Sequence, residues 1–235
     1  MYKNKPSKPI VSLAGSSGSY LQNRKEIEKM KHWIELLRQI NALWIHDNNP
    51  RRPHALLTSG KHSNGFFNGS LAICNPDLLN QLCKALIRQV DLTRLQAPQL
   101  VVGSAMGAIT IAYEIARQLD DKTQAGFTEK AGDLMELKRF PIKPGHRVLV
   151  VEDVLTTGGT TKKTIDGIKK ADGNILPFIL VLVNRSGLSQ IDDYKLISLI
   201  DHHLPIWTPE ECPLCQMGSI ALRPKDNWEA LNASY

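Results

Sequence analysis

Apolar residues recur along the chain in two patterns, one typical of amphipathic helices and one typical of buried strands. Residues 25–45, 76–90 and 109–119 carry apolar side chains at helical spacing, so we expect three helices there. Short apolar runs indicate strands at 100–102, 148–151, 175–183 and 195–200, and a further strand ends at 126–130. Pro177 interrupts one of these runs, which predicts either an edge strand or an irregular start.

The most informative stretch is residues 147–161. The unbroken apolar run Val148–Val151 suits a strand that is buried on both faces of a parallel sheet. Glu152 and Asp153 follow it, then a loop of threonines and glycines, and then a helix-forming run at 162–170. Because ligands of open α/β sheets bind outside the carboxyl ends of the strands, we expect the two acids and the loop to lie in a site.

The residue types of this loop favour a phosphate. Gly158 and Gly159 lack Cβ, so their backbone N–H groups can approach a ligand closely. The loop leads into a helix N-terminus, which favours an anion, and threonine hydroxyls add donors. Glu152 and Asp153 would repel a phosphate but can accept hydrogen bonds from sugar hydroxyls. These features outline a 5-phosphoribosyl group, whereas the Gly-Lys-Ser/Thr of a Walker A loop and the G-x-G-x-x-G spacing of a Rossmann fingerprint are both absent.

Composition restricts the classes of function. Hydrophobic residues make up 42% and charged residues 22%, as in ordinary globular domains, and no apolar run has the length of a membrane span. The formal net charge of +6 is spread along the chain, which favours small polyanionic substrates over nucleic acid. Residues 1–23 are expected to form a flexible arm before a single domain at 24–235, and the cytoplasm is the expected location.

The order of an apolar strand, Glu-Asp, two residues and Thr-Thr-Gly-Gly-Thr resembles the 5-phosphoribosyl 1-pyrophosphate (PRPP) motif of type I phosphoribosyltransferases. The alternative is an ordinary structural turn. The resemblance implies an α/β fold with a mostly parallel five-stranded sheet, flanking helices and a small N-terminal hood. It also implies PRPP-binding residues, with Asp153 counted as catalytic as well: Glu152, Asp153, Val154, Leu155, Thr156, Thr157, Gly158, Gly159 and Thr160.

Two further segments resemble parts of the same family. The loop after the strand at 100–102 is similar to the family's pyrophosphate loop and implies PRPP contacts from Ser104, Ala105, Met106 and Gly107, although Ser104 and Ala108 depart from the usual sequence. Lys130 matches the catalytic lysine at the start of a mobile loop, here expected at 131–140. Lys138 and Arg139 are its expected partners on PRPP, or else a solvated charge pair. Glu129 stands where relatives often have Arg.

The stretch at 55–68 indicates a β-hairpin, and it is also similar to the Ser-Gly-x-x-Ser segment of orotate phosphoribosyltransferases. That resemblance implies orotate contacts from Phe66, Phe67, Thr156 and Arg185. Arg is suited to a carboxylate as a bidentate fork, although an Arg after a strand can also be merely exposed. Thr58 stands just before Ser-Gly, at a position where a member of that family has lysine.

The resemblance spans about residues 30–220 and implies transfer of the phosphoribosyl group from PRPP to orotate, giving orotidine 5′-phosphate and pyrophosphate. It further implies Mg²⁺ held mainly by PRPP, with no direct protein ligand, and a homodimer. Two alternatives stay open: a phosphoribosyltransferase for another nucleobase, and a PRPP-binding regulator without turnover.

Cys212 and Cys215 have the spacing of half a zinc site, with His202 and His203 nearby in the sequence. A second cysteine pair is missing, so the sequence favours two reduced thiols in a C-terminal turn over a zinc site.

Overall fold

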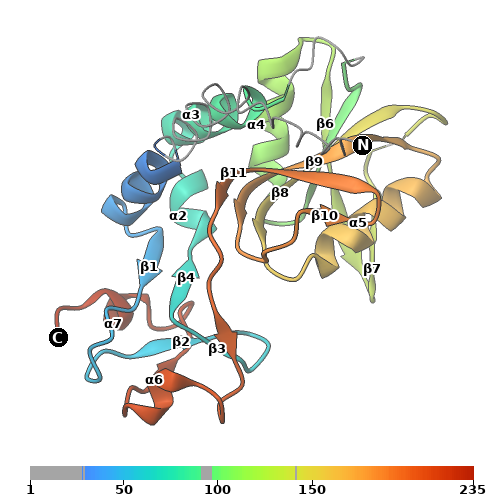
Figure 1. Cartoon of the computed structure of the whole chain (residues 1–235). Coiled ribbons are helices and arrows are strands. Elements are labelled where there is room, and N and C mark those ends of the chain that lie inside the picture. The colour runs from blue at the N-terminus through green and yellow to red at the C-terminus, as the bar shows by residue number, and fades with distance from the viewer. Residues whose placement is uncertain (1–27, 29, 91–96, 141) are drawn as a thin grey trace, which may run out of the picture.

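Figure 1 shows a sheet domain joined to a smaller lobe, which we call the hood. The computed structural model of the chain describes residues 28, 30–90, 97–140 and 142–235. The arm expected over residues 1–23 therefore lies outside the described residues, and so does the start of the first helix.

The sheet domain is built on seven strands in the order β10-β11-β9-β8-β5-β6-β7. The five inner strands run parallel, as expected, and the short strands β7 and β10 are added antiparallel at the two edges. The strands are β5 Leu100–Ser104, β6 Gln124–Ala131, β7 Leu134–Glu136, β8 Arg147–Leu155, β9 Asn174–Asn184, β10 Gln190–Ile191 and β11 Tyr194–Asp201.

Helices cover both faces of this sheet, because its central strands are apolar on both sides. Helices α3 (Pro76–Ile87) and α4 (Ile109–Leu119) pack on one face, and α5 (Gly159–Lys170) packs on the other. Side chains of β8 alternate between the two faces: Val148 and Val150 join the core under α5, whereas Leu149 and Val151 join the core under α3 and α4. This alternation decides where the two acids that follow can point.

The first helix is shorter than the apolar spacing predicts. It ends at residue 39, and part of the expected helix is instead strand β1 (Leu43–Ile45). The amide of Ala42 donates to the carbonyl of Leu37, the amide of Asn41 donates to that of Arg38, and Asn41 has a φ of 54°. This is the Schellman arrangement, in which a left-handed residue ends a helix.

Two other segments also differ from their sequence patterns. Pro177 lies in β9, which has β8 on one side and β11 on the other, so the prediction of an edge strand is wrong. The alternative prediction of an irregular start is confirmed, because the pairing of β9 with β8 shifts register around Pro177: Val148 pairs with Ile175, and Val150 pairs with Ile179. Residues 131–140, expected as a mobile loop, contain β7, which forms a hairpin with β6. This hairpin packs closely on α5, since a Cβ at Gly167 would lie 2.1 Å from the carbonyl oxygen of Met135.

The hood contains two small sheets. Strand β1 pairs with β4 (Gly65–Phe67), and the second sheet has the order β12-β3-β2-β13. Its strands are β2 His54–Leu56, β3 His62–Ser63, β12 Ile206–Trp207 and β13 Ala221–Leu222, with helices α2 Gly69–Ile73, α6 Pro213–Gln216 and α7 Trp228–Asn232 nearby in the chain. The β-hairpin expected within 55–68 is present as β2 and β3. The expected small hood is present, but the N-terminal segment does not form it alone, because C-terminal residues supply β12, β13, α6 and α7.

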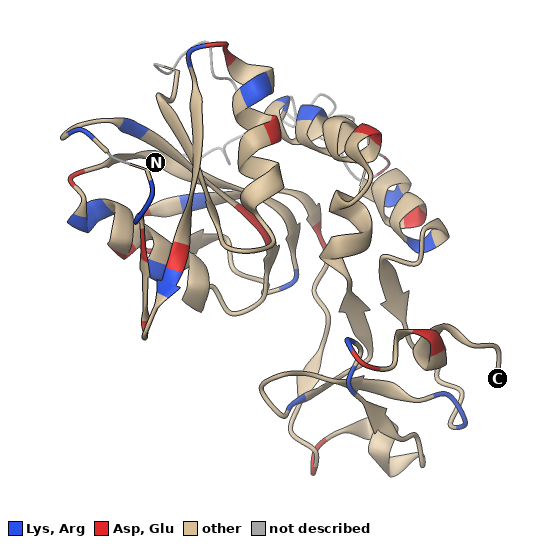
Figure 2. Cartoon of the chain, turned by 180° about the vertical axis from the view of Figure 1, so that it is seen from behind, with Lys and Arg blue, Asp and Glu red and all other residues tan. Residues whose placement is uncertain are grey.

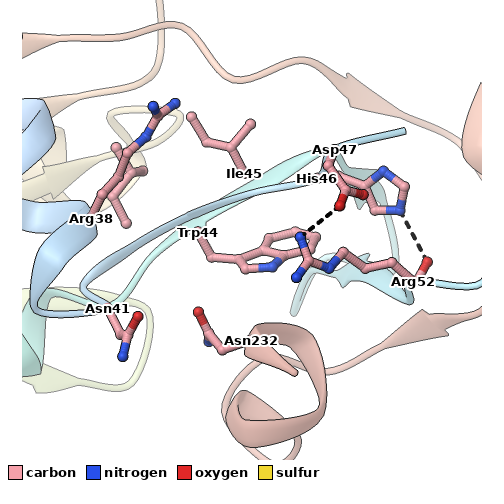
Figure 3. A pocket seen from close by; sticks show the side chains of 9 residues that line it. Arg38, Asn41, Trp44, Ile45, His46, Asp47, Arg52 and Asn232 are labelled. Carbon is pink, nitrogen blue, oxygen red and sulfur yellow. Dashed lines mark hydrogen bonds and ion pairs between the residues drawn. The ribbon is translucent and has the colours of Figure 1, made fainter. Parts of the chain in front are cut away.

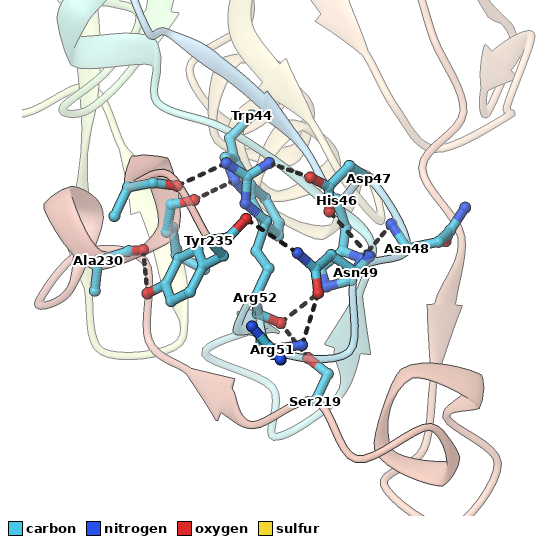
Figure 4. Close-up of polar contacts among 12 residues, drawn as sticks. Trp44, His46, Asp47, Asn48, Asn49, Arg51, Arg52, Ser219, Ala230 and Tyr235 are labelled. Carbon is cyan, nitrogen blue, oxygen red and sulfur yellow. Dashed lines mark hydrogen bonds and ion pairs between the residues drawn. The ribbon is translucent and has the colours of Figure 1, made fainter.

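Polar contacts hold the C-terminal residues against the N-terminal part of the hood (Figure 4). The indole N–H of Trp44 donates to the carbonyl of Leu231 at 2.7 Å. The guanidinium of Arg52 donates to the carbonyl of Ala233 at 2.7 Å and pairs with Asp47 at 3.0 Å. Residues 44–52 and the C-terminal residues 231–233 therefore belong to one lobe.

Charged side chains are distributed over both lobes, with acidic residues placed among the basic ones (Figure 2). Among the described helices, none combines the length and the apolar character needed to span a bilayer. The absence of a nucleic-acid partner stays a prediction from the sequence.

Candidate functional site

A pocket of about 190 Å³ opens at the carboxyl end of β8, where the sequence predicts the site. It lies between the loop after β5 and the loop that joins β8 to α5. Its lining residues are Ser104, Ala105, Gly107, Glu152, Asp153, Val154, Leu155, Thr156, Thr157, Gly158, Gly159, Thr160 and Thr161. The structure thus brings together two predicted segments that are about 50 residues apart in the chain.

The N-terminus of α5 is open to this pocket. Gly158 precedes the helix with a φ of 78°, a conformation that glycine adopts without steric cost. No side chain caps the helix, its first turn contains no acidic residue, and Thr156, Thr157 and Thr160 are exposed. The first N–H groups of a helix lack partners within it and attract anions. The loop is therefore suited to a phosphate, as the sequence predicts.

Asp153 faces the loop after β5. It is half-buried, and a Cβ added to Gly107 would lie only 1.9 Å from its Oδ2. A Cβ added to Gly69, at the start of α2, would lie 3.3 Å from the same oxygen. Gly107 therefore leaves space for this carboxylate only because it lacks Cβ, whereas a Cβ at Gly69 would require only a small shift. Asp153 is the acid that the pocket presents to a ligand.

Glu152 points to the other face of β8, as strand alternation requires. It is only 5% exposed, and its carboxylate accepts hydrogen bonds from Ser104 Oγ at 3.0 Å and from Thr161 Oγ1 at 2.7 Å. Burial, and then the charge of Asp153, raises the pKa of Glu152 to about 8, against the lowering effect of the two hydroxyls. The two acids therefore differ: Asp153 is available to a ligand, and Glu152 holds α5 against β5.

This internal network extends beneath the pocket. Ser104 Oγ lies 3.0 Å from Thr164 Oγ1, which lies 2.8 Å from Thr128 Oγ1. The sequence predicts a PRPP contact for Ser104 and gives no indication of a role for Thr164 or Thr128. Both threonines stand in ordinary helix and strand patterns, so only the packing of α5 on β5 and β6 indicates their role.

The loop after β5 offers fewer donors than the sequence suggests. The amide of Ala105 donates to the carbonyl of Thr128 at 3.0 Å, so this group is already used. Met106 is 82% exposed, and within the described part of the chain the amides of Met106 and Gly107 have no hydrogen-bond partner. Those two N–H groups are the ones that remain for a ligand.

The predicted basic residues of the hairpin lie outside the pocket lining. Lys130, Lys138 and Arg139 are all exposed, and Arg139 forms an ion pair with Glu129. Exposed pairs of this kind stabilise a conformation little. The structure therefore places three cations on a hairpin next to α5 without bringing them to the phosphate cradle.

The predicted orotate contacts are divided between the lobes. Phe66 packs its ring against Trp228 at a centroid distance of 5.8 Å, and Phe67 is buried in the main core. Neither ring is among the lining residues of the pocket, whereas Thr156 is. Adjacent residues of β4 point to opposite faces, which explains why the pair does not form one aromatic surface.

Arg185 follows β9 and is only 3% exposed. The alternative prediction, that this arginine is merely exposed to solvent at the end of a strand, is therefore wrong. Its Nη2 lies 3.5 Å from Ser63 Oγ of the hood, and its buried Nε has no hydrogen-bond partner among the described residues. Burial lowers the pKa of Arg185. Its contact with Ser63 joins the sheet domain to strand β3.

A larger hollow of about 380 Å³ lies in the hood (Figure 3). Its lining residues are Arg38, Asn41, Leu43, Trp44, Ile45, His46, Asp47, Arg52 and Asn232. Of its two arginines, Arg52 is already bound to Asp47 and Ala233, and the lining includes neither a glycine loop nor a helix N-terminus. The lining residues therefore favour the smaller pocket at β8 over the larger hollow as the binding site for a phosphorylated substrate.

Comparisons with known proteins agree with this assignment. The family model described as "Phosphoribosyl transferase domain" matches residues 75–211. A relative from Carboxydothermus hydrogenoformans, named orotate phosphoribosyltransferase, is 37% identical over 73% of this chain and 88% of its own length. A relative of the same name from Caldicellulosiruptor bescii is 35% identical over 82% of this chain and 95% of its own length. The crystal structure of orotate phosphoribosyltransferase from Aeropyrum pernix shares the fold, with a TM-score of 0.55 at 23% identity over 71% of this chain and 92% of that one. The chain therefore belongs to the phosphoribosyltransferase family.

Proposed function

We propose that this protein transfers the 5-phosphoribosyl group from PRPP to orotate, giving orotidine 5′-phosphate and pyrophosphate in pyrimidine biosynthesis. The names of the relatives support orotate as the acceptor. The pocket at β8 supports a phosphorylated sugar as the donor, because a helix N-terminus and a half-exposed carboxylate line the same space.

Two different parts of the pocket would bind the 5′-phosphate and the ribose of PRPP. Backbone N–H groups at Gly159 and Thr160, with the hydroxyls of Thr156 and Thr157, would bind the 5′-phosphate. Asp153 would accept hydrogen bonds from the ribose hydroxyls and stabilise the positive charge that develops on the sugar as the bond to pyrophosphate breaks. Glu152 supports this arrangement by fixing α5 rather than by a direct contact.

The buried guanidinium of Arg185 carries the assignment of the acceptor. A buried cation needs an anionic partner, and among the described residues the hydroxyl of Ser63 is the only hydrogen-bond partner of its guanidinium. The carboxylate of orotate would supply two acceptor oxygens to the planar fork. As the new bond to the sugar forms, the ring nitrogen of orotate loses its proton, and the departing pyrophosphate is the base that the reaction itself supplies.

Mg²⁺ is proposed as the metal that accompanies PRPP. The donor set fits an ion that arrives with its substrate, because Asp153 is the one half-exposed carboxylate of the pocket and Glu152 is already hydrogen-bonded. Mg²⁺ retains water and typically binds one or two carboxylates together with substrate phosphates. When bound, it neutralises charge on the departing pyrophosphate.

Lys130, Lys138 and Arg139 are proposed to approach the pyrophosphate from the β6–β7 hairpin. Each is exposed, and the pair between Arg139 and Glu129 is a surface contact that a pyrophosphate could replace. The resemblance to the family is the support for this role, for a homodimer and for a cytoplasmic location. Light scattering of the purified protein tests the dimer.

The deciding experiment is turnover of a base panel by the full chain with PRPP and Mg²⁺. Pyrophosphate release with orotate, and none with uracil, adenine or hypoxanthine, is the expected result. Turnover with another base alone would favour the phosphoribosyltransferase of different specificity. PRPP binding without any product would favour a regulator without catalysis.

A further inference from the structure

Four side chains of the hood converge on one point that the proposed reaction does not use. They are His54, His62, Cys212 and Cys215, and their ligand atoms all lie within 4.8 Å of one another. His54 Nε2 is 3.0 Å from His62 Nδ1 and 3.5 Å from each of the two sulfur atoms, and Cys215 Sγ is 3.2 Å from His62 Nδ1. The histidines belong to β2 and β3, and the cysteines flank the first turn of α6.

These distances match the edges of a tetrahedral site. With bonds of about 2.3 Å to sulfur and about 2.0–2.1 Å to nitrogen, the ligand atoms of tetrahedral Zn²⁺ lie roughly 3.3–3.8 Å apart. Four of the six separations are 3.0–3.5 Å, slightly shorter than this, and all six are within 4.8 Å, so small shifts of the side chains would admit the ion. Thiols are weak hydrogen-bond donors and acceptors, so hydrogen bonds alone would contribute little to holding two thiols and two imidazole nitrogens together.

The surroundings of the cluster suit a metal site. His54 and Cys212 are fully buried, and His62 is 7% exposed. The second ring nitrogen of His54, Nδ1, lies 2.8 Å from Ser219 Oγ, which itself donates to the carbonyl of Arg52 at 2.7 Å. Ser219 Oγ can therefore accept a hydrogen bond from Nδ1–H, which leaves Nε2 with its lone pair toward the cysteines. Metal-bound histidines almost always have such an outer partner.

We propose that His54, His62, Cys212 and Cys215 bind a structural Zn²⁺ ion. Two thiolates and two imidazoles form a soft donor set that favours zinc over magnesium or calcium. Four protein ligands close the coordination shell, which is the arrangement of structural rather than catalytic zinc. The site is distinct from the pocket at β8 and does not rest on the proposed reaction.

The ion would join two parts of the chain that have little core of their own. The buried hydrophobic cluster of the hood consists of Trp44, Ala55 and Leu231. Zinc would fasten the β2–β3 hairpin to α6, about 150 residues later in the chain, and would do so next to Ser63, the neighbour of Arg185. Structural zinc contributes to folding directly where the hydrophobic core is small.

The first test is the metal content of tag-free, full-length protein purified under reducing conditions after growth with added zinc. We expect one zinc ion per chain by elemental analysis. Cys212→Ser/Cys215→Ser should remove it, and Cys74→Ser, which changes an exposed cysteine outside the cluster, should retain it. A wild-type chain that contains no zinc and takes up none from added Zn²⁺ would overturn the proposal.

X-ray absorption at the zinc edge provides a test that needs no variant, in case the double variant does not fold. Two sulfur ligands at about 2.3 Å and two nitrogen ligands at about 2.0–2.1 Å are expected. An oxygen-rich shell, or a disulfide between Cys212 and Cys215 in the protein as isolated, would contradict the site. Removal of zinc from wild type by a chelator should also lower the melting temperature, and readdition of Zn²⁺ should restore it.

Discussion

Gly107→Ala tests whether the carboxylate of Asp153 must stay where the structure places it. The new methyl group would lie 1.9 Å from Asp153 Oδ2 and 2.5 Å from its Cγ. Ordinary van der Waals contact begins near 3.4 Å, so the methyl group is about 1.5 Å too close to that oxygen. The Asp153 side chain or the loop after β5 must move by about that distance. A displacement of about 1 Å in a reacting group can cost about 100-fold in rate, and we expect a loss of that order.

Gly69→Ala is the matched control, because it adds the same methyl group near the same oxygen. Its methyl group would lie 3.3 Å from Asp153 Oδ2, so a shift of a few tenths of an ångström is enough. The assay is kcat/KM for PRPP, from pyrophosphate release at saturating orotate, with the melting temperature of each variant measured alongside. The control should lose far less activity than Gly107→Ala. Equal activity of the two folded variants would refute the role given to the position of Asp153.

Two other predictions concern the remaining charged groups. Arg185→Ala should raise KM for orotate roughly 10- to 100-fold, the scale of a lost charged hydrogen bond, and should change KM for PRPP much less; equal rises would argue against a contact with the base. Arg185→Lys should recover only part of the loss, since lysine lacks the planar fork. For Glu152, a folded pKa of about 8 against an ordinary value of 4.5 means that folding takes up a proton between these pH values. This stabilisation is complete below pH 4.5 and is lost as the pH rises through about 8. Glu152→Gln should therefore show a smaller fall in melting temperature between pH 5 and pH 8 than wild type, and identical slopes would show that Glu152 is not protonated in the folded chain.

Local sequence was enough to predict the centre of the molecule. The apolar run of β8, the two acids, the glycine loop and α5 are contiguous, so their order alone places a phosphate cradle at the end of a strand. The opposite directions of Glu152 and Asp153 also follow from strand alternation, since the two acids are adjacent residues of β8.

Features that depend on distant parts of the chain could not be predicted in this way. The spacing of Cys212 and Cys215 indicates half a zinc site, but with no second pair visible the sequence favours two reduced thiols. His202 and His203, which lie nearby in the sequence, are not part of the cluster. The histidines that complete the cluster, His54 and His62, precede the cysteines by about 150 residues and come together only because β13 and β12 add to the hairpin of the hood.

Apolar periodicity likewise continued past the end of the first helix. Asn41 adopts a left-handed conformation that ends the helix. A single asparagine indicates a helix end only weakly in the sequence when apolar residues follow it at helical spacing. The burial of Arg185 against Ser63 is a contact between lobes, which periodicity within either segment does not indicate.

The central claim is that the loop between β8 and α5 binds the 5′-phosphate while Asp153 binds the ribose. A crystal structure of the full chain with PRPP and Mg²⁺ tests this most directly. The account predicts phosphate oxygens within hydrogen-bond distance of the backbone N–H groups of residues 158–161, and a ribose hydroxyl on the carboxylate of Asp153. A PRPP molecule bound elsewhere, with this loop empty, would contradict it.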